Sequence, residues 1–256
     1  DALNTAVGYS AGTAVTTGTL NTLIGANAGD SLTTGNRNVA LGYQALSTED
    51  TGSRNVAIGE GSLTALNYDG TGNNVALGYD SGHAMTTGIN NTSVGSLSMG
   101  TGVTTGNNNV AIGYYSGVNL TSGSGNIVIG VEAGDALTTG SNNIAIGYAA
   151  LSTEDGNGNN VAIGKGSLQT LNAGADAYNI AVGYNAGITM TTGVQNTIMG
   201  GLAGDALTTG NYNIAIGHTA LSTEDTGSKS VAIGHQALLN QNYNGDALNT
   251  AIGHNV

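Results

Sequence analysis

A five-residue phrase, exemplified by Asn38-Val39-Ala40-Leu41-Gly42, returns fifteen times along this chain of 256 residues. The glycine that ends each copy follows the previous one at a nearly constant interval. These glycines are Gly8, Gly25, Gly42, Gly59, Gly78, Gly95, Gly113, Gly130, Gly147, Gly164, Gly183, Gly200, Gly217, Gly234 and Gly253. Self-similarity at such a short, fixed period is typical of a solenoid, in which each repeat is too small to bury its own apolar face and stacks on its neighbours.

The phrase itself has the pattern of a β-strand. The position three before each glycine is always β-branched, the position one before is Val, Ile, Leu or Met, and Ala stands between them in most copies. This alternation has period two, and no helical period competes with it. The sequence predicts an all-β parallel β-solenoid of about fifteen coils, one continuous array over residues 1–256 and a segment of a longer fibre. We expect the bulky positions to face the coil interior.

An Asn precedes the strand in every coil except the one with Ser230. If neighbouring coils lie about 4.8 Å apart, these amides stack into a hydrogen-bonded ladder. We interpret this column as a structural feature and not as a ligand site, because Asn side chains bond backbone groups and Asn tolerates a left-handed backbone conformation. Its central members are Asn38, Asn55, Asn74, Asn91, Asn109, Asn126, Asn143 and Asn160.

Composition excludes several classes of protein. The chain has 44 Gly, no Pro, Cys, Trp or Phe, and only 8% charged residues. A β-branched residue held in one register throughout argues against disorder. The net charge of −12 gives no cationic surface for nucleic acid, no apolar run is long enough to predict membrane insertion, and the absence of Cys excludes disulfides and thiolate metal sites.

The loops between strands are of three kinds, namely Thr-Thr-Gly, Ser-Thr-Glu-Asp, and a longer loop in the coil after each Ser-Thr-Glu-Asp. They define a superrepeat of four coils between Gly147 and Gly217. The acidic loops are expected to be solvated, with calcium binding a weaker alternative because the spaced ligands of a calcium loop are missing. Their acidic residues are candidate binding residues: Glu49, Asp50, Glu154, Asp155, Glu224 and Asp225.

The residue after the phrase glycine is Tyr in alternate coils, and His218, His235 and His254 follow in three consecutive coils. Tyr at intervals of about 9.6 Å, twice the strand spacing, is either a carbohydrate-stacking stripe or, as we favour, a cap on the coil edge. The candidate binding tyrosines are Tyr43, Tyr79, Tyr114, Tyr148 and Tyr184.

We expect no cofactor, metal or catalytic site. Stacked imidazoles suggest a metal, but no carboxylate partner stands in the same column. His83 is isolated in the sequence, and no phosphate-binding loop or nucleophile elbow occurs. The chain is therefore not expected to be an enzyme.

The phrase Asn-Val-Ala-Ile-Gly, followed three residues later by a small residue, resembles the head repeats of trimeric autotransporter adhesins, the YadA-like heads. It is equally similar to the repeat arrays of phage-type tail fibre proteins, and the resemblance covers the whole chain. It implies a left-handed β-roll of three parallel chains exposed at a cell or virion surface. The coils here are longer than those of the adhesin heads.

The leading functional hypothesis is a structural, extracellular fibre segment that presents its loops to a surface glycan or protein receptor. We expect a homotrimer packed along the small-residue columns of Ala40 and Ala45, so that Ala111→Arg and Ala145→Arg disrupt it while Glu49→Arg does not. The alternative is an ice-binding solenoid with a Thr-rich face, although the acidic and long loops interrupt the Thr-Thr column.

Overall fold

The computed structural model describes residues 3–256 and has fifteen β-strands of three residues each. No α-helix or 3₁₀-helix occurs in residues 3–256, so no helix there is long and apolar enough to cross a membrane. The strands fall into two units, which end and begin at Gly125 and Asn126. The first unit contains β1 (Thr5–Val7), β2 (Thr22–Ile24), β3 (Val39–Leu41), β4 (Val56–Ile58), β5 (Val75–Leu77), β6 (Thr92–Val94) and β7 (Val110–Ile112). The second contains β8 (Ile127–Ile129), β9 (Ile144–Ile146), β10 (Val161–Ile163), β11 (Ile180–Val182), β12 (Thr197–Met199), β13 (Ile214–Ile216), β14 (Val231–Ile233) and β15 (Thr250–Ile252).

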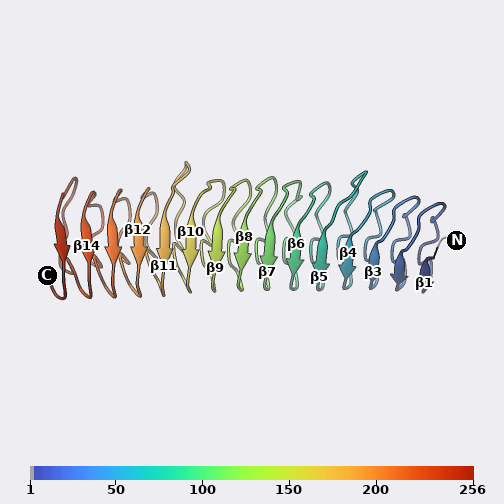
Figure 1. Ribbon diagram of the computed structural model, residues 1–256, viewed down its shortest axis with the longest axis horizontal. Coiled ribbons are helices and arrows are strands. Elements are labelled where there is room, and N and C mark those ends of the chain that lie inside the picture. Colours follow the sequence, from blue (N-terminus) through green and yellow to red (C-terminus); the bar gives the residue numbers. More distant parts are fainter. Residues whose placement is uncertain (1–2) are drawn as a thin grey trace. The chain divides into compact units, whose positions relative to one another are not determined.

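Within each unit, every strand pairs in parallel with the next strand along the chain, without a shift in register (Figure 1). Ala145 in β9 stands opposite Ala162 in β10. The backbone N–H of Ile144 donates to the carbonyl of Asn160 at 2.8 Å, and Gly164 N–H donates to the carbonyl of Ile146 at 2.7 Å. The prediction of an all-β parallel β-solenoid with about fifteen turns is confirmed.

The orientation of the strands is the reverse of the one expected. The central residue of every strand from β2 to β14 is buried in the coil, and Ala40, Ala145 and Ala162 are completely buried. The flanking bulky residues point outward, so that Leu41 is 40% exposed and Ile146 is partly exposed. The prediction that the bulky columns fill the interior is wrong, because that space is already filled from the opposite wall of the coil.

Leucines and, in some coils, methionines from the turn after the strand supply most of the largest buried side chains of the interior. Leu46 and Leu63 are fully buried in coils whose strands carry a central Ala. The coil with the larger central residue Leu23 has Gly29 at the position equivalent to Leu46. A Cβ on Gly29 would lie 2.8 Å from Leu23 Cδ2. In this coil a large strand residue and a small turn residue share the interior, as expected of a close-packed core. In coils such as that of Ala181 and Gly187, where both positions are small, the buried side chain comes from further along the turn, as Met190 does.

The Asn side chains before the strands are buried and connect the coils. The Asn143 Oδ1 accepts a hydrogen bond from the backbone N–H of Asn160 at 3.0 Å, while its Nδ2 donates to the carbonyl of Asn157 at 2.9 Å. The same pair of bonds recurs at Asn38, with Asn55 N–H and the Gly52 carbonyl as partners. Direct amide-to-amide bonds, such as Asn109 Nδ2 to Asn91 Oδ1 at 3.1 Å, occur in only some coils. The ladder thus runs mainly through backbone groups.

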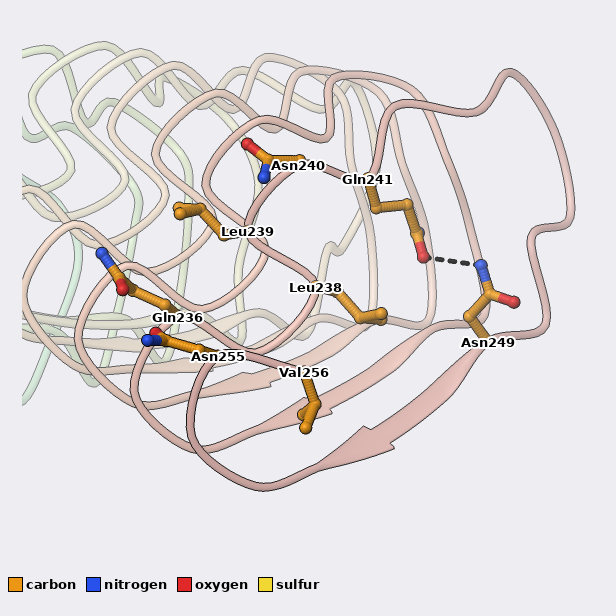
Figure 2. A pocket seen from close by; sticks show the side chains of 8 residues that line it. All are labelled: Gln236, Leu238, Leu239, Asn240, Gln241, Asn249, Asn255 and Val256. Atoms are coloured by element: carbon orange, nitrogen blue, oxygen red, sulfur yellow. Dashed lines mark hydrogen bonds between the residues drawn. The ribbon is translucent and has the colours of Figure 1, made fainter.

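Ser230 interrupts the Asn column, and a side chain from the following long loop replaces the missing amide. Gln241 Nε2 donates to Ser230 Oγ at 2.9 Å and to Glu224 Oε2 at 2.8 Å. Its Oε1 accepts from Asn249 Nδ2 at 2.7 Å, as the dashed line in Figure 2 shows. Gln241 therefore links Ser230 to Asn249, the next member of the column, through side-chain hydrogen bonds.

The glycine that ends each strand has a backbone conformation and a spacing that exclude other residues. Gly42 has φ +140°, and a Cβ at this position would lie 2.5 Å from the carbonyl oxygen of Gly59 in the next coil. Only glycine adopts such a conformation at low cost, and neighbouring backbones touch there. This explains why the column of phrase glycines is unbroken.

Candidate binding surface

The outer face of the strands presents two columns of side chains in each unit, one aliphatic and one of Val, Ile and Thr. Leu41, Ile112 and Met199 are about two-fifths exposed, at 40%, 37% and 41%. The equivalent residues on neighbouring strands are partly exposed. Because each strand contributes one residue before and one after its buried centre, the columns run along the whole strand face of each unit. The face is largely aliphatic, but Thr replaces the aliphatic residue at the first position of five strands, namely Thr5, Thr22, Thr92, Thr197 and Thr250.

The tyrosines that follow the strands extend this surface. Tyr43, Tyr79 and Tyr148 are about half exposed, at 49%, 52% and 50%, and Tyr114 and Tyr184 resemble them. In Tyr79, hydrogen bonding to Asp80 raises the pKa of the phenol above its ordinary value. The rings occupy alternate coils, so one intervening residue separates each pair along a unit.

Lys165 is the intervening residue between Tyr148 and Tyr184. Its Nζ lies 5.7 Å from the centre of the Tyr148 ring and 6.0 Å from that of Tyr184. Both distances are within the range of a cation–π interaction. Sequence reasoning missed this cluster, although a comparison of the residues after each phrase glycine would have shown Lys165 between the two tyrosines.

Three histidines continue the same column near the end of the second unit. The rings of His218 and His235 lie 5.5 Å apart at an angle of 9°, and those of His235 and His254 lie 4.7 Å apart at 13°. Since nitrogen lone pairs lie in the ring planes, parallel rings do not converge on one ion. No group of three or more His, Cys, Asp or Glu residues suited to a metal occurs in residues 3–256.

The glutamates of the acidic loops are buried, which corrects the prediction that they are solvated. Glu49, Glu154 and Glu224 have no exposed surface. Glu49 accepts hydrogen bonds from the backbone N–H groups of Gly52 at 2.7 Å and Tyr68 at 3.2 Å. Each glutamate thus fastens its own turn and the long loop of the next coil. None of the three is available to a receptor.

Burial raises the pKa of Glu49 and of Glu154 above the ordinary value for a glutamate. The N–H groups of Gly52 and Asn157 oppose the shift because they stabilise the charged form. The neighbouring acids differ from the glutamates, since Asp155 is exposed and Asp50 and Asp225 are partly exposed. Their backbone carbonyls accept hydrogen bonds from a Thr N–H of the preceding coil. Only the aspartates of these loops therefore present carboxylates at the surface.

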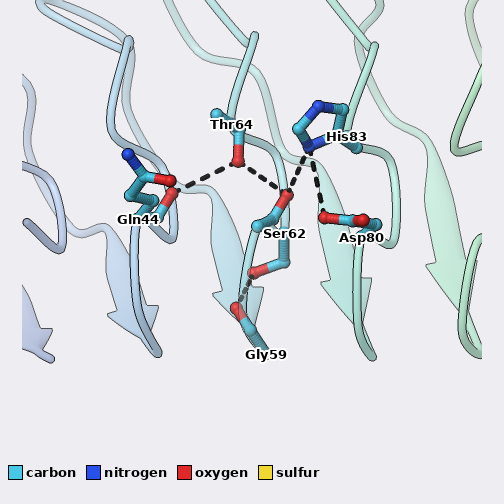
Figure 3. Close-up of polar contacts among 7 residues, drawn as sticks. Gln44, Gly59, Ser62, Thr64, Asp80 and His83 are labelled. Atoms are coloured by element: carbon cyan, nitrogen blue, oxygen red, sulfur yellow. Dashed lines mark hydrogen bonds and ion pairs between the residues drawn. The ribbon is translucent and has the colours of Figure 1, made fainter. Parts of the chain in front are cut away.

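His83 is not isolated in the structure (Figure 3). Its Nδ1 lies 3.4 Å from Asp80 Oδ1 and 3.2 Å from the carbonyl oxygen of Gly61. The Gly61 carbonyl also accepts a hydrogen bond from Thr64 Oγ1 at 2.7 Å. His83 and Thr64 therefore join two adjacent coils on the outer side of the turn, which is a structural role.

The last coils form an open pocket of about 550 Å³, shown in Figure 2. Its lining combines the apolar side chains of Leu238, Leu239 and Val256 with amides. The amides belong to Gln236, Asn240, Gln241, Asn249 and Asn255. No titratable side chain lines it, so it offers neither an acid nor a base for chemistry.

The described residues therefore provide a largely aliphatic strand face, a half-exposed aromatic column and buried acidic ties. Comparison of the chain with protein-family models, curated proteins and solved structures gives no match.

Proposed function

We propose that this chain is a structural, extracellular fibre segment of the adhesin or tail-fibre type, assembled as a homotrimer and presenting its loops to a surface glycan or protein receptor. The proposal assigns no catalytic role and no cofactor to the chain. Its packing surface differs from the one expected from sequence, because Ala40 and Ala45 are fully buried and unavailable to a partner. The outward columns of the strand face take their place.

The exposed strand face is the observation that supports this proposal. The first unit has seven strands, and its outer face carries partly exposed residues such as Leu41, Ile58 and Ile112. Contiguous apolar patches larger than roughly a few hundred Å² mark interaction surfaces. If two such faces pack together, each coil adds a similar amount of buried area. In an oligomer with closed symmetry, the face of every chain is covered by a neighbouring chain. These properties support the association of identical chains along their strand faces.

The test is the mass of the intact chain in solution, measured by sedimentation equilibrium. We expect three chains per particle, and a monomer for the double variant Ile146→Asp with Ile163→Asp, because both side chains point outward from the strand face. Thr192→Asp is the matched control, since this exposed loop residue lies away from the strands. A soluble monomer of the unmodified chain, or a trimer that survives the double substitution, contradicts the proposed assembly.

The loops bear on the ice-binding alternative. The hydroxyls of Thr16, Thr33 and Thr138 donate to carbonyl groups of the next coil at 3.2, 3.0 and 2.8 Å. A hydroxyl that is committed to the backbone is no longer free to donate to a water lattice. This supports a fastening role for the first Thr of the loop. Thermal hysteresis of the purified chain distinguishes the two functions, and a clear hysteresis gap would favour ice binding over the fibre.

A further inference from the structure

Two arginines share a polar pocket in the first unit. Arg37 and Arg54 are the only arginines between positions 1 and 125, where there is no lysine, of a chain with a net charge of −12. Both line one pocket of about 390 Å³. Its other lining residues are Thr19, Asn36, Ser53 and Thr71. No carboxylate is among them.

The repeat places the two arginines side by side. Each stands two residues before its strand, and β3 and β4 pair with Val39 opposite Val56. Arg37 has φ 58° and Arg54 has φ 63°, so the backbone has the same conformation at both positions. Adjacent coils lie about 4.8 Å apart. The two exposed side chains therefore leave neighbouring coils from matching positions.

Neither guanidinium has a carboxylate partner within the described part of the chain. The ion pairs among residues 3–256 are His83 with Asp80 and Lys229 with Asp246. Arg37 and Arg54 use their backbone N–H groups to bond the carbonyls of Thr19 and Asn36, each at 3.0 Å. Two cations on adjacent coils without a counter-ion repel one another, and a bound anion relieves this repulsion.

An equivalent position later in the chain shows where an anionic oxygen fits. Lys229 and Asp246 occupy the places of Arg54 and Thr71 in a later copy of the same pair of coils. The backbone pairing is also the same, because isolated parallel bridges join Ser53 to Thr71 and Ser228 to Asp246. There the Lys229 Nζ lies 2.6 Å from Asp246 Oδ2. The first copy has an uncharged threonine where the later copy supplies its own carboxylate.

The pocket also offers hydroxyl donors. Ser53 Oγ accepts a hydrogen bond from the N–H of Asn36 at 3.0 Å, and within residues 3–256 its own proton has no acceptor. The hydroxyl of Thr71 has no hydrogen-bond partner in the described chain. Guanidinium groups bind phosphate and similar oxyanions through two parallel N–H donors. Two guanidiniums and two hydroxyls therefore match the several acceptor oxygens of a tetrahedral anion.

We propose that this pocket binds a phosphate or sulfate group carried on a sugar-sized molecule. Its volume of about 390 Å³ exceeds the space that one inorganic anion needs and falls within the roughly 300–1,000 Å³ of small-molecule sites. The site lies on a single chain, so it does not depend on the assembly or the fibre role proposed above.

Calorimetric titration of the full chain with glucose 6-phosphate, glucose 6-sulfate, inorganic phosphate and glucose tests the proposal. Low ionic strength is required because the arginines are exposed and salt screens their charges. We expect saturable binding of the two charged sugars, weaker binding of inorganic phosphate and none of glucose. Tight binding of inorganic phosphate alone would overturn the sugar-sized ligand, and no saturable binding of any of these anions would overturn the site.

Three variants locate the binding on the chain. The double variant Arg37→Gln with Arg54→Gln is expected to bind glucose 6-phosphate at least tenfold more weakly, while Lys229→Gln, which changes a cation that already has a partner, binds as the parent does. Thr71→Asp keeps both arginines but supplies an internal carboxylate, and its affinity for glucose 6-phosphate should also fall at least tenfold. Melting curves monitor folding, and if the double arginine variant fails to fold, Thr71→Asp decides. Unchanged binding in Thr71→Asp or in the folded arginine variant overturns the proposal.

Discussion

The carboxylate of Glu49 accepts a hydrogen bond from the backbone N–H of Gly52 at 2.7 Å, in a site with no access to solvent. The pair Glu224 and Gly227 repeats this contact at the same distance. A charged group in such a place is stabilised by the N–H donors around it and destabilised by the loss of water. The balance of these two effects makes the fold sensitive to pH.

We predict that the chain becomes less stable as the pH rises from about 4.5 towards neutrality. Burial raises the pKa of Glu49, Glu154, Asp135 and Asp205 in the folded state, so the folded chain holds these protons more tightly than the unfolded chain. Their contribution to stability is complete below the unfolded pKa and is lost as the pH rises through the folded pKa. Melting temperatures measured across this range at constant ionic strength test the direction.

The double variant Glu49→Gln with Glu154→Gln is the control for this pH dependence. It removes two of the four titrating groups while keeping a side-chain oxygen that accepts from Gly52 or Asn157. The fall in melting temperature with pH should become shallower. A parent chain whose melting temperature increases steadily from pH 4.5 to 7 would show that the N–H donors outweigh burial.

Two adjacent residues in β9 test the orientation of the strand. Ala145→Asp places a carboxylate in the closed interior of the coil, where it has no partner, and should cost on the order of 3–5 kcal/mol of unfolding free energy. Ile146→Asp places the same group on the outer face, where water reaches it in an unassembled chain, and in an Ile163→Asp background that prevents assembly it should cost on the order of 1 kcal/mol. Denaturant unfolding of the two variants gives the comparison. The opposite ranking would restore the orientation expected from sequence.

Gly147→Ala should destabilise the fold by at least about 3 kcal/mol through strain and steric overlap. Gly147 has φ +132°, and its added Cβ would meet the Gly164 carbonyl oxygen at 2.6 Å. Gly156→Ala is the matched control, because the nearest atom to its Cβ is the Thr139 Oγ1 at 3.2 Å. Thermal unfolding of both variants measures the difference. Similar losses would mean that the coils have room to move apart.

Asn143→Ala should cost about 1–3 kcal/mol, because it leaves two buried backbone groups without partners. These groups are the N–H of Asn160 and the carbonyl of Asn157. Thr139→Ala, at an exposed loop position of the same coil with an ordinary backbone conformation, should change stability by less than about 0.5 kcal/mol. Hydrogen exchange at the Asn160 amide provides a local measure, and unchanged protection there would contradict a role for the ladder.

The sequence predicts the strands and the number of residues per turn well because both depend on a pattern repeated in every coil. The β-branched residues before Gly42 and its equivalents mark the strands, and the spacing of the glycines places one strand in each turn. The Asn column is likewise visible, since an amide such as Asn143 is the same distance from its strand in almost every coil. Such features are local to a coil.

The buried face of the strand was predicted incorrectly. Alternation of large and small residues distinguishes the two faces of a strand but does not show which of them is buried. In this fold the decision depends on what fills the coil from the other wall. Leu46 occupies the interior opposite Ala40, so the strand has room only for a methyl group, and Leu41 is turned outward. The chain shows this constraint only when the strand and the turn are read together, as with Leu23 and Gly29.

The binding surface was harder to predict for a related reason. Charge suggested that Glu49 is solvated, whereas its position three residues before Gly52 allows it to bond the turn. Lys165 and the Arg37–Arg54 pair are not repeated in every coil, so the repeat pattern does not draw attention to them. The candidate binding residues of this chain therefore include positions that differ from the repeat.

Because neighbouring strands pair without a shift in register, one coil can replace another in the stack. Residues 148–217 amount to four complete coils, because Gly147 and Gly217 occupy the same place in the repeat. If unequal recombination duplicated or deleted such a block in the gene, the encoded chain would pair one intact strand with another at the junction. Its cross-section would stay the same. Length is therefore a heritable trait of this architecture that changes in steps of whole turns, with little penalty in folding.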